Sequence, residues 1–235
     1  MGIIEPYFPK ETAIKLAKIA QANTFIETGT YYGGTAKWAA DEFREIHTIE
    51  LSEKIYNMVK DELSTKGNIT LYLGDSRNQL PNILKNKSEN IFFWLDGHYS
   101  GGITAGKEYP CPLINELEII LKRDNDDIIL IDDARLYTGN EFGWPSIVEI
   151  SKKVEQLSPK KRFMEICDDH IFILPDKMIY RELLLSYILD RNIVLWNENL
   201  KKNKKKLIFK RGVVKILKFM GLYNIAKKIY KMKKQ

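Results

Sequence analysis

Short apolar segments typical of β-strands alternate with helical segments through the first 175 residues. The five apolar segments span residues 24–27, 46–51, 69–73, 91–95 and 128–131. Helical patterns occupy residues 11–22, before the first of them, and residues 34–43, 52–64, 76–86 and 113–123, between them. Strands that are apolar along their whole length and alternate with helices are typical of a parallel sheet covered by helices on both faces. We therefore predict an α/β protein with five parallel strands.

The pattern changes after the fifth strand. A helix is predicted over residues 146–157, followed by two apolar runs at 163–167 and 171–174. The linker between these runs is so short that it favours an antiparallel hairpin, which we place at one edge of the sheet. Residues 178–200 are predicted to form a helix followed by a short extended piece.

Charge divides the chain into two parts. The sequence holds 37 basic and 31 acidic residues, a net charge of +6. Residues 201–235 contain 14 Lys or Arg and no Asp or Glu, which leaves residues 1–200 with 23 basic and 31 acidic groups, a net charge of −8. We predict a folded domain over residues 1–200 and a basic C-terminal tail over residues 201–235.

The first strand leads through a glycine-containing turn directly into a helix. The turn carries Glu27, Gly29, Thr30, Tyr31 and Gly33. Glycines in such a turn allow positive φ and a close approach of backbone to a ligand, and the amides at a helix N-terminus favour electronegative groups. The spacing E-x-G-x-x-x-G differs from the G-x-G-x-x-G dinucleotide pattern, which argues against NAD or FAD.

The next two strands also end in carboxylates. Glu50 follows Gly29 by 21 residues, where doubly wound nucleotide sites place the carboxylate that binds ribose hydroxyls. Asp75 follows the third strand in a polar turn. In this order the three elements resemble the class I S-adenosylmethionine-dependent methyltransferases, whose fold is Rossmann-like. The alternative for Asp75 is an N-cap of the helix that begins near Ser76.

The resemblance implies a role for each of these positions. Glu27 and the residues from Gly29 to Gly33 would cradle the methionine part of S-adenosylmethionine. Glu50 would hold the ribose, and Asp75 would contact the adenine.

Further carboxylates follow the fourth and fifth strands. Asp96 is followed two residues later by His98, and the fifth strand ends in Asp132 and Asp133. Neighbouring strands lie about 4.8 Å apart, so these three carboxylates converge if the two strands are adjacent and parallel. Without a cation they would repel one another; a hard divalent ion, most simply Mg²⁺, would stabilise them.

This arrangement narrows the resemblance to the metal-dependent sugar O-methyltransferases of macrolide and aminocoumarin antibiotic sugars, which carry LDGD-type and IDD-type motifs. The resemblance implies that Asp96, Asp132 and Asp133 bind the metal, with Asp96 also at the cofactor and reaction centre. His98 departs from the family by replacing the second acid of LDGD, and we interpret it as the candidate general base. Alternatively, the aspartates cap a turn and His98 is an ordinary loop histidine.

The segment 101–108 nearly matches the phosphate-binding pattern G-x-x-x-x-G-K-[ST]. Glu108 replaces the required hydroxyl residue, and Pro110 and Pro112 disfavour a helix directly after the lysine. A nucleotide hydrolase is therefore the weaker enzyme alternative. We interpret residues 98–109 as a flexible loop on the acceptor side.

The predicted function is methyl transfer to a sugar hydroxyl of a glycan or glycosylated metabolite. Arg135, Tyr137 and Trp144 could line the sugar pocket, or could simply pack in the core. The alternative from another class is a non-catalytic module, associated with membrane or RNA, that has the same fold.

The tail combines lysine clusters with apolar residues at helical spacing. This pattern is typical of an interfacial helix attracted to anionic lipid. Nucleic-acid binding is the less favoured alternative, because the acidic domain would repel it; a helix packed on its own domain is the other. No apolar run approaches the ~20 residues of a membrane span, and a signal peptide is not evident. We expect a cytoplasmic protein, located peripherally at the inner face of the membrane through residues 201–235.

Overall fold

A computed structural model describes residues 8–99, 106, 108, 110–140 and 143–219 of the 235-residue chain, with the side chains of 203–219 left out of the description. The chain divides into two compact units, residues 1–184 and residues 185–235. We call them the sheet unit and the helical unit. This division lies upstream of the change in charge at residue 201.

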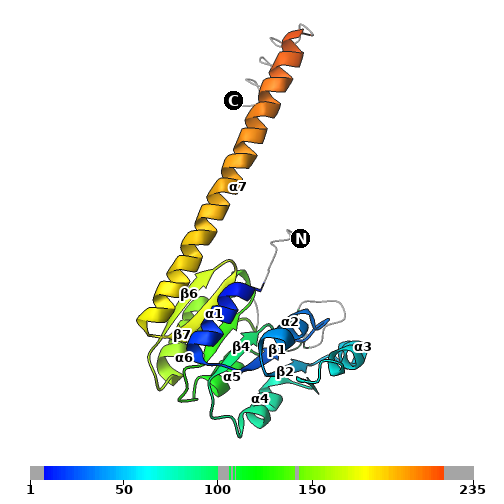
Figure 1. The fold of residues 1–235 in the computed structure, drawn as a ribbon, viewed down its shortest axis with the longest axis vertical. Helices are drawn as coiled ribbons and strands as arrows, with labels where there is room; N and C mark the ends of the chain where they lie inside the picture. The colour runs from blue at the N-terminus through cyan, green and yellow to red at the C-terminus, as the bar shows by residue number, and fades with distance from the viewer. Residues whose placement is uncertain (1–7, 100–105, 107, 109, 141–142, 220–235) are drawn as a thin grey trace. The chain divides into compact units, whose positions relative to one another are not determined.

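The sheet unit is built on one seven-stranded sheet in the order β3-β2-β1-β4-β5-β7-β6 (Figure 1). The strands are β1 (Thr24–Thr28), β2 (Glu45–Glu50), β3 (Ile69–Leu73), β4 (Ile91–Leu95), β5 (Ile128–Ile131), β6 (Arg162–Cys167) and β7 (His170–Pro175). Strands β1 to β5 pair in parallel, and the β6–β7 hairpin pairs with β5 in the antiparallel direction. The predicted five parallel strands with a hairpin at one edge are confirmed.

The helices follow the predicted positions closely. They are α1 (Lys10–Ala20), α2 (Gly34–Glu42), α3 (Glu53–Ser64), α4 (Ser76–Leu84), α5 (Leu113–Ile120), the short 3₁₀ helix η1 (Ala134–Leu136), α6 (Ile147–Leu157) and α7 (Met178–Phe219). The first turns of α3, α4 and α6 are capped by Ser52, Asp75 and Ser146, whose side-chain oxygens accept backbone N–H groups.

Helix α7 is the exception to the prediction. The extended piece expected within residues 178–200 is wrong, because one helix runs from Met178 to Phe219. This stretch contains no proline, its only glycine is Gly212, and leucine and lysine, both good helix formers, are abundant in it. Gly221, a residue type that disfavours a continuous helix, lies outside the described residues. Among the described residues, no helix is both long enough and apolar enough to cross a membrane.

The central strands are buried on both faces. Phe25 and Ile26 are neighbours on β1 and therefore point to opposite sides of the sheet. Phe25 stacks on Phe92 of β4, in an aromatic cluster that includes Trp38 of α2. Ile26 belongs to the apolar cluster on the other face, to which α4, α5 and α6 contribute. Both faces thus carry helices, as the apolar strands predicted.

The register of the parallel strands sets the position of the functional residues. Thr28, the last residue of β1, pairs with Ile49 of β2 and with Leu95 of β4, and Leu95 pairs with Ile131 of β5. Four strands therefore end at nearly the same level. The polar residues that follow them meet at one edge of the sheet.

Candidate functional site

The glycine turn after β1 packs against the end of β4. Gly29 has a φ of +85°, and a Cβ built on it would lie 2.8 Å from the carbonyl carbon of Asp96 and closer still to the carbonyl oxygen. Only glycine combines this conformation with this approach. Gly33, with a φ of +71°, begins α2, and a Cβ there would meet Leu63. The turn expected to cradle a ligand is thus fixed to the strand that carries Asp96.

Glu50 ties the same turn to the end of β2. Its Oε2 accepts a hydrogen bond from the Tyr31 N–H at 2.9 Å, and its Oε1 accepts one from the Ser52 N–H at 2.8 Å. Burial raises the pKa of the Glu50 carboxyl, and the backbone hydrogen bonds oppose that rise. The predicted contact of Glu50 with a ribose stays a prediction, and the structure shows that Glu50 also holds Tyr31 in its positive-φ conformation.

Glu27 lies buried below the turn, with 1% of its surface exposed. The Thr48 hydroxyl donates to its Oε2 at 2.6 Å and lies 2.7 Å from the hydroxyl of Thr30. Burial raises the pKa of Glu27 to about 8, although the bond from Thr48 opposes the rise. Without a cationic partner, this carboxyl is therefore mostly protonated at neutral pH.

Asp75 serves as the N-cap of α4. Its carboxylate accepts the Arg77 N–H at 2.8 Å and forms an ion pair with the Arg77 guanidinium. These interactions hold the pKa of Asp75 below its usual value. The N-cap reading of Asp75 is confirmed, and its contact with adenine stays a prediction.

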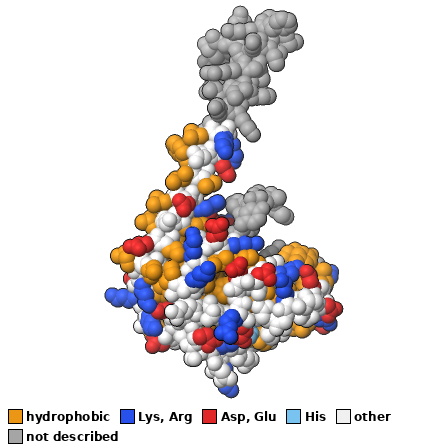
Figure 2. Space-filling view, viewed as in Figure 1, with side chains coloured by type: hydrophobic (Ala, Val, Ile, Leu, Met, Phe, Trp, Pro, Cys, Tyr) orange, Lys and Arg blue, Asp and Glu red, His pale blue; other side chains and the backbone are white. Residues whose placement is uncertain are grey.

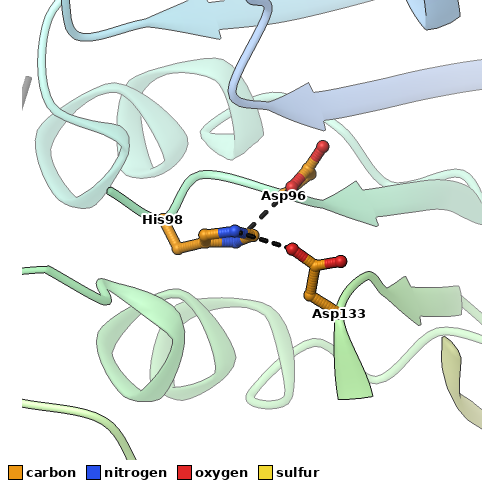
Figure 3. Close-up of side chains that lie close together, drawn as sticks. All are labelled: Asp96, His98 and Asp133. Carbon is orange, nitrogen blue, oxygen red and sulfur yellow. Dashed lines mark ion pairs between the residues drawn. The ribbon is translucent and has the colours of Figure 1, made fainter. Parts of the chain in front are cut away.

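His98 lies between two carboxylates at the ends of β4 and β5 (Figure 3). Its Nδ1 is 3.4 Å from Asp96 Oδ1, and its Nε2 is 3.0 Å from Asp133 Oδ2. One ligand atom from each of the three residues lies within 4.8 Å of the others. In the described part of the chain, this is the one such group of His, Cys, Asp or Glu that could hold a metal ion. The histidine side chain is only 5% exposed.

Asp132 is not part of this group, although the sequence predicted it there. Its Oδ1 accepts the Asp133 N–H at 2.7 Å and lies 3.4 Å from His170 Nε2. Both residues follow the last residue of β5, and Asp133 adopts a left-handed conformation with a φ of 55°, so the two side chains leave the chain in different directions. The structure therefore brings Asp96, His98 and Asp133 closest together, and the predicted role of Asp132 as a metal ligand stays a prediction.

The carboxylates around His98 differ in their pKa values. Burial, together with repulsion by Asp132 and Asp133, raises the pKa of Asp96 well above its usual value. Burial and the neighbouring Asp133 raise the pKa of Asp132 to about 6. Burial also acts on Asp133, but hydrogen bonds from His98 and Arg135 outweigh it and lower its pKa. Of these three carboxyls, Asp133 alone has hydrogen bonds and positive charges that outweigh its burial.

Sequence reasoning missed the link between the β6–β7 hairpin and this group. The Arg135 guanidinium forms ion pairs with Asp133 and with Asp169 in the hairpin turn. Asp169 also accepts the Arg135 N–H at 2.8 Å and, through its backbone carbonyl, the Ala134 N–H. The signal in the sequence was the pair of aspartates in a very short linker; Asp169 has a positive φ of 67° there.

A buried acid lies close to Gly97, the residue between Asp96 and His98. Glu116, in the first turn of α5, is 1% exposed, and burial raises its pKa to about 7. A Cβ on Gly97 would lie 3.3 Å from Glu116 Oε1 and 3.1 Å from the Thr28 hydroxyl. Glu116 and Thr28 thus line the backbone that connects Asp96 to His98, and only apolar periodicity was visible for this helix in the sequence.

The acceptor side is described in part. The centroid of the Trp144 ring lies 5.2 Å from the centroid of the His98 ring and 5.6 Å from the centroid of the Tyr137 ring. Residues 100–105, 107 and 109 lie outside the described residues, and with them most of the predicted acceptor loop and of the P-loop-like segment. Helix α5 begins only at Leu113, after residues 110–112 outside any helix, whereas a phosphate-binding loop needs a helix directly after its lysine.

The structure is similar to solved methyltransferase structures. One is the O-methyltransferase TomG from Streptomyces achromogenes, which is involved in tomaymycin synthesis and was solved with S-adenosylmethionine. Its sequence is 16% identical to this chain. The match covers 72% of this chain and 80% of TomG, with a TM-score of 0.50. The chain has the class I methyltransferase fold.

Two more matches have lower scores. Precorrin-6y C5,15-methyltransferase from Geobacter metallireducens is 13% identical, with 71% of this chain and 86% of that one covered and a TM-score of 0.48. The Podospora anserina methyltransferase PaMTH1, solved with S-adenosylhomocysteine, is 17% identical, with coverage of 74% and 85% and a TM-score of 0.47. No protein-family model matches the chain, and no curated protein sequence is similar to it.

Proposed function

We propose that this class I fold is an S-adenosylmethionine-dependent O-methyltransferase that acts, with the help of a divalent cation, on a sugar hydroxyl of a glycan or glycosylated metabolite. The observation that carries the proposal is the group of Asp96, His98 and Asp133 beside the glycine turn of β1. A methyl donor and a site for proton removal need to be adjacent for such a reaction, because much of the rate comes from holding the reactants together.

The residues of the turn fit S-adenosylmethionine, which supplies an electrophilic methyl group when bound. Gly29 holds the turn against the backbone of Asp96, and Glu27 is a buried carboxyl with no cationic partner among the contacts described for it. Pairing with an ammonium group would favour the ionised form of Glu27 and offset its burial. Glu50 keeps acceptor capacity, since each carboxylate oxygen can accept more than the one backbone bond it receives.

The residues between β4 and β5 fit a divalent cation. Two carboxylates and one imidazole approach one another closely, and burial together with the neighbouring Asp132 and Asp133 raises the pKa of Asp96, a charge conflict that a divalent cation would relieve. Oxygen ligands suit Mg²⁺ or Mn²⁺. A bound cation would acidify the acceptor hydroxyl, as it does water.

His98 is proposed as the general base, with Asp96 and Asp133 as the ligands of the cation. Nε2 pairs with Asp133 and orients the imidazole, and Nδ1, which has no hydrogen-bond partner among the described residues, is the nitrogen that would take the proton. Asp132 is proposed to orient Asp133, whose N–H it accepts. Trp144 beside His98 offers an aromatic wall of the kind that lines small-molecule sites and packs against a sugar ring.

The direct test is an assay with labelled S-adenosylmethionine and a panel of nucleotide sugars and glycans, in Mg²⁺, in Mn²⁺ and in chelator. We expect one methyl group on a sugar hydroxyl, lost in chelator and restored by the cation. His98→Ala should lower kcat by about 10²- to 10⁴-fold. Transfer to an amine or carbon acceptor, or transfer that is unchanged in chelator, would contradict the proposal.

A further inference from the structure

The helical unit carries an exposed apolar stripe in the first part of α7. The stripe consists of Leu185, Leu189, Ile193, Trp196 and Leu200, whose exposed fractions are 57%, 53%, 58%, 66% and 51%. At 3.6 residues per turn these five positions fall within a sector of about 80° around the helix axis. Figure 2 shows hydrophobic side chains gathered along this part of the helix.

The opposite side of the same turns is different in character. Asp190, Arg191 and Glu198 lie more than about 90° away from the centre of the stripe. Val194 also lies on that side and is 43% exposed. Helix α7 therefore has a continuous apolar stripe over four turns, while the opposite side mixes its charged residues with the exposed Val194 and Leu195.

The stripe leads directly into the basic part of the chain. Lys201 and Lys202 follow Leu200 in the same helix, and residues 201–235 hold 14 basic groups and no acidic ones. A partner that accepts both an apolar stripe and a dense positive charge needs an apolar layer beneath a negatively charged surface. An anionic lipid bilayer offers this combination.

We propose that α7 docks on an anionic membrane surface. The stripe from Leu185 to Leu200 enters the boundary between headgroups and acyl chains, with Trp196 at the level that tryptophan favours at membrane interfaces. The basic residues from Lys201 onward bind lipid phosphates. This inference is independent of the methyl-transfer proposal, since no residue of the candidate site takes part.

Two other occupants fit the observations less well. A second copy packed in parallel along the stripe would bring 28 positive charges together with no acidic residue in the two tails to balance them, and these like charges would repel one another. A nucleic acid would pair with the lysines but would leave the apolar stripe exposed to water.

The experiment is sedimentation of the full chain with vesicles of phosphatidylcholine alone or with about 30% phosphatidylglycerol. We expect binding to the anionic vesicles to be at least about tenfold tighter than to neutral ones, and to weaken in 0.5 M salt because salt screens charge. The emission of Trp196 should shift to shorter wavelength on binding, and Trp196→Phe should remove that shift.

A matched pair of variants tests the stripe itself. Leu189→Glu lies at the centre of the stripe, and Val194→Glu introduces the same charge on the opposite side of the helix. We expect Leu189→Glu to weaken vesicle binding about tenfold or more and Val194→Glu less than about threefold, with equal helix content by circular dichroism and equal binding of S-adenosylmethionine.

Three results would overturn the proposal. They are equal affinity for neutral and anionic vesicles, equal effects of the two glutamate variants, and a concentration-dependent dimer that Leu189→Glu dissociates while vesicle binding stays unchanged. The last result would identify a second copy of the chain as the occupant.

Discussion

Gly29 of the β1 turn and Asp96 at the end of β4 touch through their backbones, so closely that a methyl group on Gly29 would overlap the Asp96 carbonyl. The contact joins the turn proposed to hold the methyl donor to the strand end proposed to hold the cation. The placement of the methyl donor relative to the acceptor thus depends on Gly29, where no side chain fits.

Gly29→Ala should destabilise the sheet unit by about 2–4 kcal/mol. About 1 kcal/mol comes from the positive φ, and the rest comes from overlap with backbone atoms that cannot move aside. Gly34→Ala is the matched control, because nothing lies within 4 Å of its added Cβ and its φ is not in the left-handed region. Urea unfolding of both variants measures the difference, and equal stabilities would rule out the overlap.

Glu27→Gln should change how stability depends on pH. Because the folded-state pKa of Glu27 is raised to about 8 from 4.5, the folded chain holds this proton more tightly than the unfolded chain does. The contribution of the protonated Glu27 to the free energy of unfolding is fully present below pH 4.5. It is lost as pH rises to about 8, at no more than about 1.4 kcal/mol per pH unit. Unfolding free energies at pH 5, 6.5 and 8 should therefore fall less steeply in Glu27→Gln; an unchanged slope would assign the pH dependence to other groups.

Asp133→Asn and Asp132→Asn should separate the two neighbouring carboxylates. Asp133 lies in the group with Asp96 and His98, whereas Asp132 faces His170. We expect Asp133→Asn to weaken Mn²⁺ binding by at least about tenfold, which corresponds to 1.4 kcal/mol, and Asp132→Asn to have a smaller effect. Calorimetric titration with Mn²⁺ gives both affinities. The reverse order would return Asp132 to the set of ligands predicted from the sequence.

Arg135→Gln should lower kcat about tenfold and leave the KM for S-adenosylmethionine unchanged. The arginine holds Asp133 against the β6–β7 turn through Asp169 and makes no contact with the glycine turn among the described interactions. Arg181→Gln is the control, because its side chain is equally exposed, at 44%, and pairs with Asp176, which follows the opposite end of β7 from Asp169. Equal kcat values for the two variants would show that Arg135 does not position the catalytic group.

Periodicity and strand ends were enough to predict the sheet, its parallel strands and the meeting of Asp96 and Asp133 at one edge. These features depend on local patterns and on the geometry of parallel strands, which brings their carboxyl ends together. The glycine turn was visible because its conformation requires particular residues.

The remaining features depend on side-chain direction and on contacts between distant segments. Asp132 and Asp133 read alike in the sequence, and only the direction of each side chain separates them. The Arg135–Asp169 pair joins segments that no spacing rule connects. The length of α7 was missed because β-branched residues near its middle resemble a strand when read alone.

Calorimetric titration of the full chain with S-adenosylmethionine tests the central proposal most directly. We expect one molecule bound per chain, with affinity at least about tenfold weaker in Gly29→Ala and unchanged in Gly34→Ala. If the wild-type chain shows no saturable binding up to about 1 mM, where binding free energies fall to about −4 kcal/mol, the fold does not act as a methyltransferase in this protein.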